Sequence, residues 1–229
     1  MTSELIDKKL ECPICNTHFT SKKVKRSKIS VIKRHPDYYT EYGGENPTYY
    51  GVFVCPVCGY SAFEGNFNDI TENEKQIMIQ AIGLQWKGRS YSNKRSIKDA
   101  IEAHKLALLA YDLRNYKSSI IGKIALRLSW FYREGGNIES ESFYKKIVLE
   151  RFQKAFLEER LDEKEDEEIV IMYIIGELLR CKGEFENAIK WYDKVLKNPT
   201  IKKKRHLEIR IRNQWSLAHE EYIKSKGGI

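Results

Sequence analysis

The sequence predicts a mainly α-helical protein with a small β-rich head at its N-terminus. Four of its five cysteines form two close pairs within residues 12–58, beside short runs of β-branched and aromatic residues. From Thr71 onward Pro199 is the only proline, and apolar residues recur with a helical period. The chain has 229 residues, of which 41% are hydrophobic, and this suits a packed core. We therefore predict a head at residues 1–68 and a helical domain at residues 69–229 that ends in a capping helix.

The two cysteine pairs are Cys12-Pro-Ile-Cys15 and Cys55-Pro-Val-Cys58, and Gly59 follows the second pair. Two residues between the thiols let both sulfurs point at one ion from a tight turn, and Gly59 permits the positive φ that brings backbone amides near them. Two such turns make a closed tetrahedral set of four thiolates, which is typical of structural zinc and leaves no open position for a catalytic water. The sequence therefore predicts one Zn²⁺ held by Cys12, Cys15, Cys55 and Cys58 in a zinc-ribbon-like head.

The cysteine pattern leaves alternatives to zinc open. Iron in a rubredoxin-like site is the main rival, because four thiolates accept either metal. Disulfides are disfavoured in a reducing cytoplasm, and two matching pairs are better explained as one site than as a redox motif. The 39 residues between Cys15 and Cys55 exceed the common spacing, but a longer loop costs only about 0.6 kcal/mol per doubling of its length. Cys181 lies alone on an apolar helical pattern, so we predict that it is a small core residue.

Local patterns indicate where strands and the first helices lie. Residues 49–54 and 60–67, on either side of the second cysteine pair, have the composition of short strands. Residues 71–74 and 96–99 match the capping box, in which the first and last side chains satisfy backbone amides at the start of a helix. We therefore expect helices to begin directly after Thr71 and near Ser96.

Three further helices are expected toward the C-terminus. Apolar residues from Phe185 to Leu196 fall on one stripe of a 3.6-residue period, and Gly183 marks the end of the helix before it. Residues 169–179 have the composition of a buried strand, but their length and the neighbouring glycines favour a helix. The last helix, at about residues 205–224, is apolar on one face and charged on the other, as expected of an end cap.

The last third of the chain resembles tetratricopeptide repeats. The small and aromatic positions of that helix–turn–helix motif occur in their usual order at Gly176, Gly183, Phe185, Ala188 and Tyr192. Weaker matches lie upstream at periods longer than the usual 34 residues. The resemblance implies a tetratricopeptide-like α–α superhelix, in which small residues let neighbouring helices approach closely.

A second resemblance covers nearly the whole chain. Its features are the first Cys-Pro-x-Cys, the segment Asn-Pro-x-Tyr-Tyr-x-Val-x-Val-Cys-Pro-x-Cys-Gly-Tyr at residues 46–60, and residues 126–133 with Gly136. Together they resemble the bacterial family named domain of unknown function 2225. The resemblance implies a zinc-ribbon-like head on a tetratricopeptide-like body, and it implies no activity.

The favoured interpretation of function is a non-enzymatic scaffold that binds a peptide or protein partner in a helical-repeat groove. The inner helices of stacked pairs line a concave surface of this kind. The groove residues expected on these helices are Arg127, Trp130, Tyr132, Arg133, Tyr173, Glu177 and Arg180. An enzyme is disfavoured because the sequence has no Gly-rich phosphate loop, no Gly-x-Ser-x-Gly and no second histidine completing a metalloprotease motif at His219 and Glu220.

Nucleic-acid binding through the head is the alternative interpretation. The formal net charge is +8, and basic residues adjoin the first cysteine pair. They are Lys22, Lys23, Lys25, Arg26, Lys28, Lys33 and Arg34. A zinc tetrathiolate carries about two net negative charges, and the sequence has no recognition-helix pattern, so this alternative is the weaker one.

The sequence also bears on location. Residues 1–11 are polar with mixed charge and do not resemble an export signal. The longest apolar run, residues 169–175, is far shorter than the roughly 20 residues needed to cross a bilayer. We therefore expect a cytoplasmic protein with no membrane partner.

Overall fold

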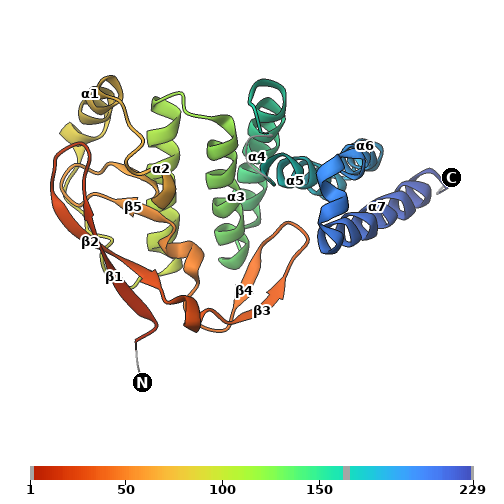
Figure 1. The fold of residues 1–229 in the computed structure, drawn as a ribbon, viewed down its shortest axis with the longest axis horizontal. Coiled ribbons are helices and arrows are strands. Elements are labelled where there is room, and N and C mark those ends of the chain that lie inside the picture. Colours follow the sequence, from red (N-terminus) through yellow and green to blue (C-terminus); the bar gives the residue numbers. More distant parts are fainter. Residues whose placement is uncertain (1–2, 162–165, 228–229) are drawn as a thin grey trace. The chain divides into compact units, whose positions relative to one another are not determined.

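The computed structural model describes residues 3–161 and 166–227 (Figure 1). Within these residues seven α-helices follow three short strand pairs, which confirms the predicted mainly α fold with a small β-rich head. The chain divides into two compact units, namely residues 1–34 with 40–144 and residues 35–39 with 145–229. The first unit therefore joins the head to the helices that follow it. The domain boundary between residues 68 and 69 stays a prediction.

Three antiparallel strand pairs build the β part of the head. They are β1 (Leu5–Glu11) with β2 (His18–Val24), β3 (Val31–Arg34) with β4 (Thr40–Tyr42), and β5 (Val52–Val54) with β6 (Ser61–Phe63). The first pair ends at Glu11 opposite His18, and the third ends at Val54 opposite Ser61. Each of these two pairs therefore closes in a turn that carries one pair of cysteines.

Two short 3₁₀ turns limit the strands around the second cysteine pair. The first, Pro47–Tyr50, begins where the Asn46 side chain accepts a hydrogen bond from the backbone N–H of Thr48 at 3.0 Å. The second, Glu64–Asn66, follows β6 directly. Strands exist where the sequence predicts them, but β5 and β6 are shorter than residues 49–54 and 60–67, because local turn chemistry takes their outer ends.

The first unit holds the helices α1 (Glu72–Ala81), α2 (Ile97–Leu113) and α3 (Ser118–Glu134), and α4 (Ile138–Glu158) begins in it. Both predicted capping boxes are present, with the Glu74 carboxylate accepting from the N–H of Thr71 at 2.7 Å and Asp99 from Ser96 at 3.0 Å. Helix α2 packs on β5 and β6. The N–H of Phe63 in β6 donates to the hydroxyl of Tyr111 at 3.0 Å, and the ring of His104 lies 6.3 Å from that of Phe63.

The second unit contains α5 (Glu167–Cys181), α6 (Phe185–Lys197) and α7 (Arg205–Lys226). The three helices agree with those expected from the sequence at residues 169–179, 185–196 and 205–224. Helices α5 and α6 approach closely, since a Cβ on Gly176 would lie 2.8 Å from Cε1 of Tyr192. Ala188 and Tyr192 are completely buried at the same contact. The predicted need for small residues between these helices is therefore met in the structure.

Helices α3 and α5 end in the same kind of turn. Gly136 has a φ of 71° and Gly183 a φ of 83°, values that favour glycine. The N–H of each glycine donates to the carbonyl three residues earlier, at 3.0 Å in both turns. The N–H of the next residue then donates to the carbonyl five residues before it, at 2.8 Å to Tyr132 and 2.9 Å to Leu179. The two turns lie at matching positions of the helical pattern.

The prediction that Cys181 is a small core residue is wrong. Cys181 is the last residue of α5 and is exposed. Its sulfur lies 3.6 Å from a carboxylate oxygen of Glu177, which is itself buried. The apolar pattern ends before Cys181, so the residue falls on the outer edge of the buried stripe.

Candidate metal centre

The first cysteine turn connects β1 and β2. The N–H of Cys12 donates to the carbonyl of Thr17 at 3.0 Å, and the N–H of Asn16 donates to the carbonyl of Cys12 at 2.9 Å. Asn16 has a φ of 55°, a left-handed conformation that asparagine tolerates better than most residues. Inside the turn the amides of Ile14 and Cys15 donate to the sulfur of Cys12. The turn thus directs backbone N–H groups at the first thiol.

The second cysteine turn, between β5 and β6, repeats this construction. The N–H of Cys55 donates to the carbonyl of Tyr60 at 2.8 Å, and the N–H of Gly59 donates to the carbonyl of Cys55 at 3.0 Å. Gly59 has a φ of 73°, as the sequence predicts. Gly59 and Asn16 each stand four residues after the first cysteine of their pair. This shared spacing is a signal in the sequence for the role of Asn16, a role that was not predicted.

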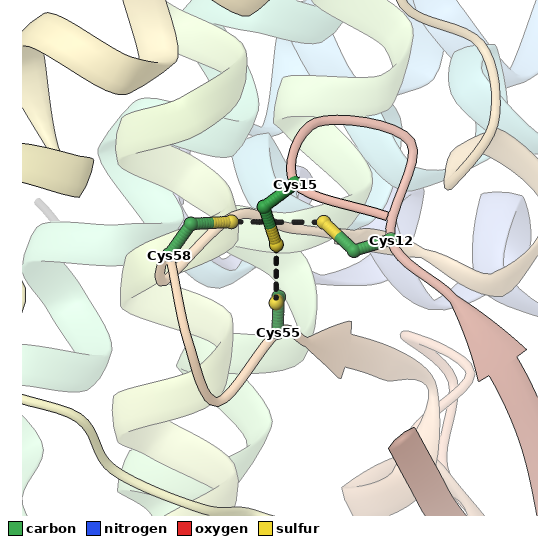
Figure 2. Close-up of side chains that lie close together, drawn as sticks. All are labelled: Cys12, Cys15, Cys55 and Cys58. Atoms are coloured by element: carbon green, nitrogen blue, oxygen red, sulfur yellow. Dashed lines mark hydrogen bonds between the residues drawn. The ribbon is translucent and has the colours of Figure 1, made fainter. Parts of the chain in front are cut away.

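The two turns bring the four sulfurs together (Figure 2). The sulfurs of Cys12 and Cys58 are 3.6 Å apart, as are those of Cys15 and Cys55, and all four lie within 4.8 Å of one another. These distances exclude disulfides, whose sulfurs are about 2.05 Å apart. A tetrahedral metal with bonds of about 2.3 Å to sulfur needs sulfur–sulfur distances of about 3.8 Å. The four thiols therefore fit one tetrahedral metal ion.

The burial of the site suits a structural metal. Cys12 and Cys55 are completely buried, and Cys15 and Cys58 are half-buried. Among residues 3–161 and 166–227, these four cysteines form the group of His, Cys, Asp or Glu side chains that is close enough to hold a metal ion. Because all four positions of the tetrahedron are filled by sulfur, the arrangement has the closed form of structural sites.

The thiols strongly influence one another's ionisation. Hydrogen bonds from Cys12 and Cys58 lower the pKa of Cys55 to about 2, and its own turn adds backbone N–H donors. The hydrogen bond with Cys55 raises the pKa of Cys12 to about 12, and contact with Cys12 raises the pKa of Cys58 as well. Four sulfurs this close compete for protons, and a metal cation removes this competition because it binds all four as thiolates.

Trp86 covers the second cysteine turn, a contact that the sequence did not predict. Its indole Nε1 donates to the carbonyl of Pro56 at 2.8 Å. A Cβ on Gly59 would lie 2.7 Å from two atoms of the same indole. Trp86 reaches this place because α1 ends at Ala81 and the 3₁₀ turn Gly83–Gln85 redirects the chain. Nothing in the local sequence pattern marks such a long-range contact.

Four of the predicted groove residues, Arg127, Trp130, Tyr132 and Arg133, lie on α3 in the first unit. All four are half-buried. The ring of Tyr132 stacks on Tyr144 at 5.4 Å, and Nε of Arg133 donates to Glu141 at 2.8 Å.

The other three, Tyr173, Glu177 and Arg180, lie on α5 in the second unit. Tyr173 and Glu177 are buried, and Glu177 accepts hydrogen bonds from Arg180 at 2.8 Å and from the hydroxyl of Tyr192 at 2.9 Å. The structure therefore gives Tyr173 and Glu177 contacts within the helical core. The binding role assigned to all seven residues stays a prediction.

The basic residues of the head are only partly engaged in ion pairs. Lys22 pairs with Asp7 at 2.7 Å, and Lys23 pairs with Glu64 at 2.9 Å. Lys25 is half-buried. The remaining four are exposed on the 3₁₀ turn before β3 and on β3 itself, and they are Arg26, Lys28, Lys33 and Arg34. Their contact with nucleic acid stays a prediction.

Comparisons with known proteins place the chain in a family. No solved structure matches it. Among the described residues, no helix has both the length and the apolar character that a membrane crossing requires. A Borreliella burgdorferi protein described as "Uncharacterized protein" is 26% identical over 165 residues, which are 64% of this chain and 59% of that relative. The chain thus spans less than two thirds of this relative's length. A family model described as "Uncharacterized protein conserved in bacteria (DUF2225)" matches residues 5–218, and the chain therefore belongs to this bacterial family, as its motifs indicated.

Proposed function

We propose that this protein is a zinc-containing, non-enzymatic scaffold of the bacterial cytoplasm that binds a peptide or protein partner through its helical pairs. The observation that carries the proposal is the closed set of four cysteines in the head, with sulfur pairs 3.6 Å apart. A metal with four sulfur ligands has no open position for water or substrate, so its contribution is to folding.

Zinc is the proposed metal for chemical reasons. Four thiolates in a tetrahedron suit zinc and iron, and zinc is the usual choice for structural sites with paired Cys-x-x-Cys turns. Backbone amides of Ile14, Cys15 and Val57 donate to the sulfurs, which stabilises the thiolate form. The metal would then hold together two turns that are far apart in the chain.

The helical pairs support the scaffold role. The close contact of Gly176 with Tyr192 and the similar turns at Gly136 and Gly183 support an arrangement of elongated, tetratricopeptide-like helical pairs. Stacked pairs of this kind present a concave surface to partners. On α3, the half-buried side chains of Tyr132 and Arg133 are the predicted groove residues best suited to a first test, since each keeps some exposed surface.

The test is affinity capture from the native host, followed by binding measurements with the purified partner. The chain with Tyr132→Ala and Arg133→Ala should bind the partner at least tenfold more weakly than the wild type. A matched control removes the same side-chain types from α7, with Tyr222→Ala and Arg212→Ala, and should bind normally. If both double variants bind like the wild type, the α3 surface is not the binding site. If no partner is retained in any bacterial lysate, the scaffold proposal fails.

Nucleic-acid binding is the second candidate, and one observation favours it. Arg26, Lys28, Lys33 and Arg34 are exposed on the same short stretch of the head. A backbone contact with phosphates would be tolerant of sequence and sensitive to salt. Retardation of DNA or RNA at 50 mM salt should therefore disappear when these four residues are neutralised together. Neutralising Lys202 and Lys203 instead should have a smaller effect, and absence of any retardation would exclude this candidate.

A further inference from the structure

The guanidinium of Arg127 is enclosed in the first unit, and no acidic side chain among the described residues pairs with it. Its carbon lies 4.5 Å from the centre of the Phe63 ring, and Gly51 leaves room for it because a Cβ there would overlap with Nη1. The Nη1 atom is buried and has no hydrogen-bond acceptor among the residues that the structure describes. A buried N–H group without an acceptor is costly, and a guanidinium is more so because it is charged.

Two other arginines of the same unit show how this fold satisfies a buried guanidinium. Arg95 donates to the carbonyls of Tyr91, Tyr49 and Val52 at 2.9–3.2 Å and also reaches the hydroxyl of Ser21 at 3.3 Å. Arg114 pairs with the carboxylate of Glu74 at 2.9 Å. Each has acceptors supplied by neighbouring segments of the unit. Nη1 of Arg127 therefore stands out as a buried donor without an acceptor in the part of the chain that the structure describes.

The surroundings of Arg127 keep its positive charge unneutralised. Burial lowers its pKa to about 10, so it remains charged at neutral pH, and the side chains with an electrostatic effect on it are the tyrosines Tyr42 and Tyr111. His104 lies in the same region: its ring is 6.3 Å from that of Phe63, and Nδ1 donates to the carbonyl of Ala100 at 2.8 Å. The pKa of His104 lies well below its ordinary value, mainly because the ring is buried and secondly because the positive charge of Arg127 is near. His104 is therefore neutral, and its buried Nε2 is a second polar atom without a partner among the described residues.

We propose that Arg127 anchors a binding site for a small oxyanion, a phosphate or a carboxylate, between β6 and α3. The planar guanidinium presents N–H donors in the fork that matches two oxygens of such a group. Arg127, Phe63 and Tyr42 each keep some exposed surface, although Nη1 itself is buried. His104 is neutral and adds no repulsion to this charge. This inference goes beyond the scaffold proposal and does not depend on it.

The stability of a variant separates a ligand site from a structural role. Replacing an uncompensated buried charge by an apolar side chain of similar length is often neutral or stabilising. We therefore expect Arg127→Met to unfold at the same temperature as the wild type or at a higher one. If Arg127 were needed chiefly for packing on Phe63, the same variant would unfold at a clearly lower temperature.

The binding test uses the full chain with its metal, titrated by calorimetry with inorganic phosphate and, separately, with acetate at constant ionic strength. The wild type should show saturable binding of at least one of them, and Arg127→Met should bind at least tenfold more weakly. Lys123→Met, which removes a positive charge from the same helix, should bind like the wild type. Preference for phosphate or for acetate identifies the ligand class. No saturable binding by the wild type, or equal binding by Arg127→Met, would overturn the proposal.

A second measurement covers the case in which Arg127→Met does not fold. The Nε–Hε signal of Arg127 in the wild type, assigned through Arg127→Lys, can be followed by NMR during the same titrations. It should shift with a saturable dependence on the concentration of phosphate or acetate. An unchanged signal at concentrations up to tens of millimolar would count against the site as firmly as the calorimetric result.

Discussion

The indole of Trp86 lies directly against the backbone of Gly59, behind the second cysteine turn. A Cβ on Gly59 would lie 2.7 Å from two indole atoms and 3.0 Å from Cγ2 of Ile82. Trp86 also contacts Pro56, because its Nε1 donates to the Pro56 carbonyl at 2.8 Å. The turn that carries Cys55 and Cys58 is therefore held by packing from outside as well as by the site within.

Replacing Gly59, which directly follows Cys58, should disturb the metal site although Gly59 is not a ligand. Gly59→Ala combines a φ of 73° with overlap against the indole, so we expect a loss of about 2–4 kcal/mol in unfolding free energy and a weaker metal affinity. Asn16→Ala is the matched control, since Asn16 also has a positive φ, of 55°. It should cost only about 1 kcal/mol, as expected for the backbone strain alone. Urea unfolding measures the stability of both variants, and competition with a zinc chelator measures their metal affinity. If Gly59→Ala and Asn16→Ala lose the same unfolding free energy, the contact of Trp86 with Gly59 does not contribute to the effect.

Removal of the metal should unfold the head and spare the helices. The purified chain should hold about one zinc per molecule, released in step with titration of the cysteine thiols, because binding and folding of such sites are one process. Cys12→Ser or Cys58→Ser should lose the metal and the near-UV signal of the head, with far-UV helicity largely kept. Cys181→Ser is the control, because Cys181 lies outside the cluster. A red protein would show iron, and a folded protein without metal would refute the site.

The sequence predicted that the four cysteines of the candidate metal centre come together, but it predicted less of what surrounds them. Cys12, Cys15, Cys55 and Cys58 could be assigned because the chemistry of a metal site restricts residue type and spacing. The start of α6 at Phe185 could be predicted because its apolar stripe is local. The contacts of Trp86 and Arg127 could not, because they join residues far apart in the sequence and depend on tertiary packing. The apolar pattern of α5 indicated a helix buried on most sides and so favoured a core position for Tyr173, but the burial of the charged Glu177 could not be predicted from it.

The ion pair between Glu74 and Arg114 should make stability depend on pH in the acid range. Although burial raises the pKa of Glu74, hydrogen bonds from Arg114 and Thr71 outweigh it, and the pKa lies below its ordinary 4.5. A lowered pKa in the folded state stabilises the protein above the ordinary pKa, and this stabilisation is lost as pH falls through the folded value. Glu74→Gln should cost about 1.5–3 kcal/mol at pH 7 and little at pH 3.

The comparison of wild type with Glu74→Gln isolates this effect, since the protonation of the metal thiolates in acid affects both proteins equally. Urea unfolding at pH 7, 5 and 3 measures the difference in free energy. The difference should shrink toward zero as the pH falls. A constant difference would show that Glu74 acts through packing and not through its charge.

Trp215 on α7 should contribute less than a fully buried tryptophan. It is half-buried, its Nε1 donates to Asp193 at 3.0 Å, and its ring stacks on His219 at 5.2 Å. Truncating a fully buried tryptophan to alanine lowers the unfolding free energy by about 3–5 kcal/mol. Because Trp215 is only half-buried, we expect Trp215→Ala to lower it by about 2 kcal/mol. Trp215→Phe should recover the packing and lose the hydrogen bond. Thermal unfolding of both variants checks this, and a loss as large as that of a core residue would mean that Trp215 is buried in solution.

The contact between α5 and α6 gives the sharpest test of the helical pair. Ala188 is completely buried, and Gly176 lies so close to Tyr192 that a Cβ would come within 2.8 Å of its ring. Tyr192 cannot easily move away, because its hydroxyl donates to the buried Glu177 at 2.9 Å. Ala188→Leu and Gly176→Ala should therefore each overpack the contact and cost about 1–3 kcal/mol. Ala218→Leu on α7 tests a different buried alanine, and Asn187→Leu adds the same bulk to an exposed position of α6.

Hydrogen exchange locates these effects along the chain. Nearest neighbours carry the stability of stacked helices, so Ala188→Leu and Gly176→Ala should speed exchange in α5 and α6 first. Exchange in β1, β2 and the cysteine turns should change little, because these elements lie in the other compact unit. Asn187→Leu should leave all rates close to those of the wild type. If Ala188→Leu leaves protection between residues 169 and 196 unchanged, these two helices do not form a tightly packed pair, and the scaffold proposal loses its structural support.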